Sequence, residues 1–211
     1  MNPTPWTIEA SYDQVARQYA ETFFEELARK PFDRQLLDTF AARVRAQGMV
    51  CDLGCGPGHV ARYLKDWGVE VCGVDLSAAM VQHASQRNPD IPFHKGDMRA
   101  LDFPSAAFTG IVVFYSLIHL QRPEVPQALQ ELHRVLQVHA PLLLALHGGK
   151  GEVHTENCFG QGVAIDATLF TAEEMTGYLH QAGFQVAQAA EREPYAFEYQ
   201  SRRVYILAHK G

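Results

Sequence analysis

Apolar residues recur at helical spacing near the start of the chain and form short continuous runs further along. Residues 12–28 and 32–46 have apolar side chains three and four positions apart, which predicts two helices. Beyond them, apolar runs predict strands at residues 49–53, 69–75, 91–94, 111–115 and 141–147, and helical spacing returns at residues 60–67, 78–86 and 124–137. Strands that are apolar throughout and alternate with helices indicate an α/β fold, in which helices cover both faces of a mostly parallel sheet.

The last third of the chain has a less regular pattern. Residues 148–167 are rich in glycine and polar side chains without a clear period, so we predict an irregular insertion. Thr171 and Glu174 have the spacing of a capping box at the start of a helix, which we expect to end at Gly183. Two further strands are predicted at residues 184–189 and 203–208, and we expect them to pair antiparallel.

The charge balance narrows the possible partners. The chain has 211 residues, a hydrophobic fraction of 47% and a formal charge of −6. This composition fits a folded domain and disfavours a nucleic-acid surface, because phosphate binding needs clustered Lys and Arg. No apolar stretch approaches the ~20 residues of a membrane span, and the first residues lack the order of a signal peptide. We therefore expect a cytoplasmic protein, monomeric or homodimeric, that binds a small molecule and no membrane.

Cysteine and histidine spacing gives no sign of a metal site. Of the four cysteines, three fall in or beside predicted buried strands or the glycine turn that follows the first strand. None shows the CxxC spacing of structural zinc, and the histidines lack HxxxH or HExxH spacing. We expect reduced thiols and no bound metal.

The strongest chemical signal is a glycine-rich turn between the first strand and the next helix. Asp52 lies at the end of the strand, and Gly54, Gly56 and Gly58 follow at alternate positions. Glycines let the backbone approach a ligand closely, and the N-terminus of the next helix offers free N–H donors, so we expect a nucleotide-like ligand across this turn. Dinucleotide enzymes use GxGxxG, whose third small residue is here replaced by His59, and this disfavours NAD.

Acidic residues follow the next two strands as well. Asp75 ends the second strand, where a carboxylate is placed to accept hydrogen bonds from both ribose hydroxyls, a role that suits NAD equally. Asp97 follows the third strand, where it is placed to accept from an adenine amino group. Leu76 and Met98 then flank the adenine ring with apolar surface. Three acids at the ends of three successive strands favour one adenosine-containing ligand.

With these motifs the sequence resembles the class I S-adenosylmethionine-dependent methyltransferases, of the type that acts on small molecules. The matching segments are DLGCGPG at residues 52–58, GVDLS at 73–77, GDMRALDFP at 96–104, IVVFYSLIHL at 111–120, RVLQ at 134–137, LFTAEEM at 169–175 and AGF at 182–184. The resemblance implies S-adenosyl-L-methionine as cofactor and S-adenosyl-L-homocysteine as product. It also implies a three-layer Rossmann-like fold with N-terminal lid helices and a seven-stranded sheet in the order 3-2-1-4-5-7-6, the last strand antiparallel. Residues 137–141 depart from the family, because many relatives have a glycine-containing turn there.

The same resemblance implies roles for individual residues. Asp52 is expected to bind the methionine amino group through water, Asp75 the ribose, and Asp97 with Met98 the adenine. The start of the first helix resembles a lid over the cofactor, although packing of this helix on the domain explains its tyrosines equally well. The cofactor-binding residues implied in this way are Tyr12, Tyr19, Asp52, Gly54, Cys55, Gly56, Gly58, Asp75, Leu76, Asp97, Met98, Phe114 and Ser116.

The acceptor of the methyl group is not identified by the sequence. Transfer from a sulfonium needs a base only where the acceptor must lose a proton. His119, after the fourth strand, is our candidate base, and His147, at the end of the fifth, is the next. We expect residues 148–168 and the first helix to select a small acceptor. A macromolecular acceptor such as tRNA or protein, and a non-catalytic module that binds S-adenosylmethionine, remain alternatives.

The chain contains no repeat, low-complexity tract or linker that would mark a second domain. We expect one methyltransferase domain over residues 1–211. Residues 1–47 form its helical lid and substrate element, residues 48–147 its cofactor-binding half, and residues 148–211 the insertion and the C-terminal, substrate-side half.

Overall fold

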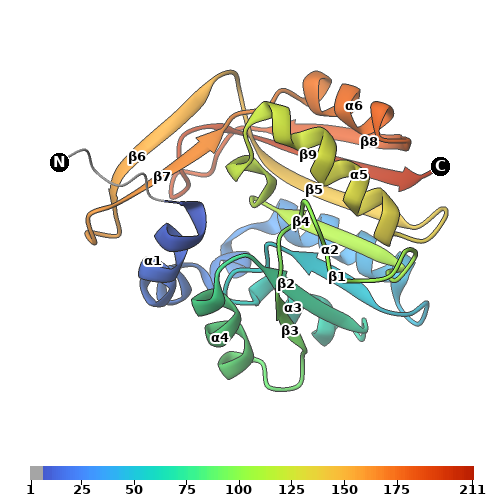
Figure 1. The fold of residues 1–211 in the computed structure, drawn as a ribbon, viewed down its shortest axis with the longest axis horizontal. Coiled ribbons are helices and arrows are strands. Elements are labelled where there is room, and N and C mark those ends of the chain that lie inside the picture. The colour runs from blue at the N-terminus through green and yellow to red at the C-terminus, as the bar shows by residue number, and fades with distance from the viewer. Residues whose placement is uncertain (1–6) are drawn as a thin grey trace.

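A seven-stranded sheet in the order β3-β2-β1-β4-β5-β9-β8 forms the centre of the protein (Figure 1). The computed structural model describes residues 7–211. The strands are β1 (Val50–Leu53), β2 (Val71–Asp75), β3 (Phe93–Lys95), β4 (Gly110–Phe114), β5 (Pro141–Gly148), β8 (Phe184–Arg192) and β9 (Arg202–Lys210). Strands β1 to β5 pair in parallel, and β9 runs antiparallel to both β5 and β8. The expected sheet order, with an antiparallel last strand, is confirmed.

Helices cover both faces of this sheet because successive strand residues point to opposite sides. In β4, Ile111 and Val113 pack in one apolar core, whereas Val112 packs in the other. The first core lies under α5 (Val125–Val135) and α6 (Ala172–Gln181), and the second under α2 (Pro31–Val44) and α3 (His59–Asp66). The remaining helices are α1 (Ile8–Phe23), α4 (Ala78–Arg87) and the short 3₁₀ turns η1 (Glu26–Arg29), η2 (Leu117–His119) and η3 (Arg122–Glu124). No helix within residues 7–211 is long and apolar enough to cross a membrane.

The insertion expected to be irregular forms a hairpin instead. Strands β6 (Glu152–Cys158) and β7 (Val163–Thr168) pair antiparallel, with a bulge between Thr155 and Cys158. Most side chains of β6 are exposed, so this strand lacks the apolar alternation on which sequence-based assignment depends. In Figure 1 the hairpin reaches from the sheet toward α1, and Ser11 Oγ in α1 donates a hydrogen bond to the carbonyl oxygen of Ala164 in β7 (3.0 Å).

The capping box predicted at the start of α6 is only half formed. The hydroxyl of Thr171 accepts the Glu174 N–H at 3.1 Å, as expected. The Glu174 carboxylate does not return to the Thr171 backbone and instead forms an ion pair with Arg122 at 2.7 Å. The tertiary ion pair therefore takes the place of the local hydrogen bond, while the helix still begins at the predicted residue.

Candidate functional site

A cavity of about 550 Å³ opens where the carboxyl ends of β1, β2 and β4 meet, beneath α1. Most residues that the sequence singled out for cofactor binding come together here. Those that line the cavity are Tyr12, Tyr19, Gly54, Gly56, Asp75, Leu76, Asp97, Met98, Phe114 and Ser116. In open α/β sheets this edge is where ligands bind.

Two positions in the turn after β1 require glycine, each for a different structural reason. Gly54 has a φ of +73°, and a Cβ there would lie 2.1 Å from the Cβ of Ser116, so the turn can approach β4 only without a side chain. Gly58 also has a positive φ, but a Cβ there would meet Phe93 at 2.8 Å, and this glycine does not line the cavity. Gly54 and Gly56 leave the cavity wall as bare backbone, which is a surface that fits a close-lying ligand.

Asp75 connects the two turns that border the cavity. One carboxylate oxygen accepts the Gly56 N–H at 2.8 Å, and the other accepts the Ser77 N–H at 2.9 Å. Burial raises the pKa of this carboxyl group to about 6. Each oxygen retains a lone pair beyond these bonds, so Asp75 still has acceptor capacity toward a ligand.

Asp52 and Cys55 lie behind the cavity wall. Asp52 is buried, and its carboxylate accepts the N–H of Ala61 at 2.9 Å in the first turn of α3. Burial raises its pKa to about 7. Cys55 is also buried, with its Sγ against Gly73. In this structure both residues support the wall, and neither lines it directly.

Asp97 lines the cavity together with an arginine that the sequence did not single out. Its carboxylate accepts hydrogen bonds from the backbone N–H of Arg99 at 2.9 Å and from the Arg99 side chain at 2.6 Å. These hydrogen bonds lower the pKa of Asp97. Arg99 also pairs with Glu124, which lines the same cavity. The part of the cavity around Asp97 therefore contains an ion-paired arginine, and only the spacing of two residues between Asp97 and Arg99 could have suggested it.

Helix α1 closes over the cavity through contacts to two other elements. The Asp13 carboxylate accepts the hydroxyl of Ser77 at 2.6 Å and the N–H of Ala79 at 3.0 Å, at the start of α4. Ser11 binds β7, as described above. The tyrosines of α1 thus lie over the cavity, where a lid is expected.

His119 and Tyr12 bind each other above the cavity. His119 Nδ1 lies 2.9 Å from the carbonyl oxygen of Asp166, and Nε2 lies 2.7 Å from the Tyr12 hydroxyl. A carbonyl oxygen only accepts, so Nδ1 donates and Nε2 accepts the Tyr12 proton. Burial lowers the pKa of His119 and raises that of Tyr12. Both nitrogens of the candidate base are therefore occupied, and taking a proton from an acceptor requires the Tyr12 hydroxyl to move or to pass that proton on.

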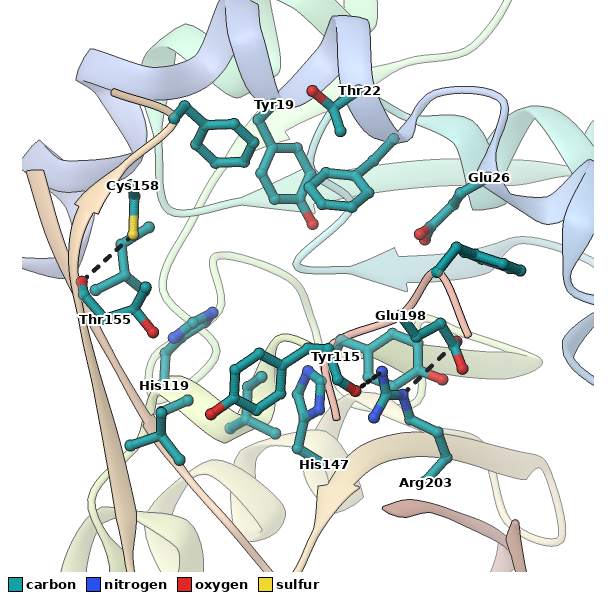
Figure 2. A pocket seen from close by; sticks show the side chains of 18 of the residues that line it. Tyr19, Thr22, Glu26, Tyr115, His119, His147, Thr155, Cys158, Glu198 and Arg203 are labelled. Carbon is teal, nitrogen blue, oxygen red and sulfur yellow. Dashed lines mark hydrogen bonds and ion pairs between the residues drawn. The ribbon is translucent and has the colours of Figure 1, made fainter. Parts of the chain in front are cut away.

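A second cavity of about 530 Å³ lies on the far side of this pair (Figure 2). Its apolar wall includes Phe23 of α1, Phe159 of the hairpin turn, and Val153, Ile165 and Leu169. Its polar wall includes Glu26, Lys30, His147, Glu198 and Arg203. Six residues line both cavities, namely Tyr12, Tyr19, Tyr115, Ile118, His119 and Ala167.

The polar wall is built from buried ion pairs. Lys30 pairs with Glu26 at 2.7 Å, and Glu198 pairs with Arg192 at 2.6 Å. Burial alone would raise the pKa of Glu198, but the bond from Arg192 outweighs it and lowers the pKa to about 2. The side chain of Glu198 is only 3% exposed, so its loop packs into the protein instead of extending into solvent.

Comparison with known protein families agrees with this geometry. Residues 50–139 match the family model described as "Methyltransferase domain". A putative methyltransferase of Bacillus subtilis, YqeM, is 30% identical over 182 residues, which cover 82% of this chain and 73% of that protein. A malonyl-[acyl-carrier protein] O-methyltransferase of Enterobacter lignolyticus is 33% identical over 130 residues, or 62% of this chain. The chain spans about half (49%) of the length of that protein.

Solved structures share the fold at lower identity. An S-adenosylmethionine-dependent methyltransferase of Methanosarcina mazei superimposes with a TM-score of 0.70 at 19% identity, covering 77% of this chain and 92% of that one. At this identity the similarity concerns the fold alone.

Proposed function

The chain belongs to the class I S-adenosylmethionine-dependent methyltransferases, and from this premise we propose that it transfers the methyl group of S-adenosylmethionine to a small molecule bound in the second cavity. The first cavity then holds the cofactor, and S-adenosylhomocysteine is the product. A cytoplasmic location and the division of the domain into a lid, a cofactor half and a substrate half stay predictions.

The observation that supports this proposal is the boundary between the two cavities. One cavity has the bare glycine backbone and the strand-end acids that suit an adenosine and a methionine moiety. The other has an apolar wall and a separate polar wall. Because six residues line both, the two cavities adjoin, and a ligand in each would lie against the same residues.

The residues of the chain serve mainly to bind and align. Bound S-adenosylmethionine supplies an electrophilic methyl group on a sulfonium, and the electron pair of the broken carbon–sulfur bond stays on sulfur. Asp75 would accept from the ribose hydroxyls, Asp97 and Met98 would contact the adenine, and the backbone near Phe114 and Ser116 would face the methionine moiety. Tyr12 and His119 would exclude water at the boundary, since their mutual bond closes the roof there.

The size of the second cavity bears on the class of acceptor. The Enterobacter relative is named for a malonyl group on an acyl-carrier protein. The second cavity of about 530 Å³ lies within the usual size of small-molecule sites, and this favours a small acceptor over tRNA or a folded protein. A non-catalytic module that binds only S-adenosylmethionine requires one cavity, so the second cavity, which adjoins the first, favours catalysis.

A thermal shift measurement tests the cofactor assignment. The purified chain is heated with S-adenosylmethionine, S-adenosylhomocysteine or NAD, each at about 100 times the micromolar affinity expected of a cofactor. Ligand at that excess adds about 2.7 kcal/mol of stability, or a rise in melting temperature of roughly 5–10 °C for a protein of this size. We expect the two adenosyl-sulfur ligands to produce this rise and NAD to produce none. A rise with NAD alone would overturn the proposal.

A further inference from the structure

His147 lies on the polar wall of the second cavity. It is near the carboxyl end of β5, and its ring centroid lies 5.4 Å from that of Tyr115 and 5.7 Å from that of Tyr199. It lines the second cavity and not the first. Figure 2 shows it beside Tyr115, between His119 and Arg203.

The Nδ1 edge of the imidazole is fixed by two successive hydrogen bonds. Nδ1 lies 2.7 Å from the hydroxyl of Ser201, and the same hydroxyl accepts from Arg203 Nη1 at 2.9 Å. A guanidinium only donates, so the single hydrogen of Ser201 is free to point at Nδ1. Among residues 7–211 the Ser201 hydroxyl has no other acceptor, so we assign its hydrogen to Nδ1 and the imidazole proton to Nε2.

The Nε2 edge of the imidazole is available to a ligand. Among residues 7–211, no hydrogen-bond partner of Nε2 is present, and the atom is not sealed from the cavity. Burial and the charge of Arg203 lower the pKa of His147 to about 3, with His119 and Lys30 acting in the same direction and Glu198 against it. At neutral pH the side chain is thus an uncharged hydrogen-bond donor, and it is poorly suited to hold a proton as a base.

We propose that His147 recognises the acceptor by donating a hydrogen bond from Nε2 to a carboxylate oxygen, and that the acceptor carries this carboxylate on an apolar body. This inference rests on the proposed function and specifies the class of substrate for the same site. Arg203 lines this wall beside His147, and its charge favours an anionic oxygen over an ammonium group there. Glu198 lies 3.7 Å from Arg203 but has a closer partner in Arg192 at 2.6 Å, and Lys30 and Glu26 pair with each other at 2.7 Å.

The apolar body follows from the opposite wall. Phe23, Phe159 and Val153 line it together with Ile165 and Leu169. Burying an apolar group of two fused rings there removes on the order of 150 Å² from water. The carboxylate then serves as the handle that turns the molecule toward Tyr115 and the boundary with the first cavity.

Binding of matched probes to the protein saturated with S-adenosylhomocysteine tests this inference. The probes are 2-naphthoate and 2-naphthylmethylammonium, which share one apolar body and differ in charge. Titration calorimetry compares the wild-type protein with His147→Leu, His147→Gln and Ser201→Ala. Gln keeps an amide N–H near the position of Nε2, Leu removes it, and Ser201→Ala removes only the hydroxyl at Nδ1.

We expect naphthoate to bind the wild-type protein more tightly than the ammonium probe. His147→Leu should weaken naphthoate about tenfold or more, the usual effect of losing a hydrogen bond to a charged group. His147→Gln should retain most of the affinity, Ser201→Ala should give an intermediate loss, and the ammonium probe should respond to none of the three. The affinity of each variant for S-adenosylhomocysteine shows that its fold is retained.

Four results would overturn the inference. These are unchanged naphthoate binding in His147→Leu, equal losses with Leu and Gln, tighter binding of the ammonium probe, and no binding of naphthoate to the loaded wild-type protein. Failure of the wild-type protein to bind S-adenosylhomocysteine is a different result, because it contradicts the proposed function itself and the inference with it.

Discussion

Asp75 is held at the first cavity by hydrogen bonds from two separate segments of the chain. It accepts one N–H from the glycine turn after β1 and one from the turn that leads into α4. It is thus fixed in position by two separate segments before any ligand arrives, and a ligand hydroxyl need only reach its remaining lone pairs. Such preorganisation lowers the entropic cost of binding.

The substitution Asp75→Asn should weaken binding of S-adenosylhomocysteine by about tenfold to a hundredfold, because hydrogen bonds to a charged acceptor are the stronger kind. Isothermal titration calorimetry measures this directly. Asp90→Asn is the matched control, since Asp90 is exposed and pairs only with Arg62 outside the cavity. Equal affinities in wild type and Asp75→Asn would place the ribose elsewhere.

At the scale of elements, α1 functions as a roof because of contacts to segments far away in the chain. Asp13 binds residues at the start of α4, 64 and 66 positions further on, and Ser11 binds β7, 153 positions further on. The roof therefore depends on the sheet and the hairpin being in place. Its own apolar face, which includes the buried Val15, Ala16 and Ala20, attaches it to the domain.

Asp13→Ala should loosen this roof. It removes two hydrogen bonds worth about 1 kcal/mol each, so we expect faster protease cleavage near α1 and affinity for S-adenosylhomocysteine lower by about tenfold. Limited proteolysis and calorimetry on the same sample measure both effects. Glu21→Gln in the same helix is the control, because Glu21 forms only an exposed pair with Arg17. A cleavage rate that is the same in both variants would show that Asp13 does not hold α1 over the cavity.

The elements that sequence analysis predicted correctly are those whose signal is local. The strands β1 and β4, the glycine turn and the capping hydroxyl of Thr171 each follow from residues a few positions apart. The hairpin β6–β7 was missed because most side chains of β6 are exposed, so this strand has no apolar alternation to reveal it. The polar wall was missed for another reason. Arg192 and Asp33, which form a buried ion pair at 3.0 Å, are 159 residues apart, and no periodicity or motif connects them.

For the whole molecule, buried ionisable groups change the stability of the fold with pH, and they do so in opposite directions. Asp52 and Asp75 have pKa values raised by burial to about 7 and about 6, above the usual aspartate pKa of about 3.9. Each therefore contributes stability at low pH that is lost as pH rises through those values. His147 is the reverse case, since its pKa is lowered to about 3 from 6.5. Its contribution is present above pH 6.5 and is lost as pH falls toward 3.

The pH dependence of unfolding in His147→Gln isolates the histidine contribution. Between pH 7 and pH 5 the unfolded His147 gains a proton and the folded one does not, which costs the wild-type protein about 2 kcal/mol of stability. The variant lacks this term but keeps both aspartates, so its stability should rise relative to wild type by about that amount over the same range. Urea unfolding of the ligand-free protein at pH 5, 6 and 7 measures the difference. If the stabilities of His147→Gln and wild type change with pH in the same way, His147 is protonated in the folded state at pH 5. The assignment of His147 as an uncharged hydrogen-bond donor on the polar wall would then be wrong.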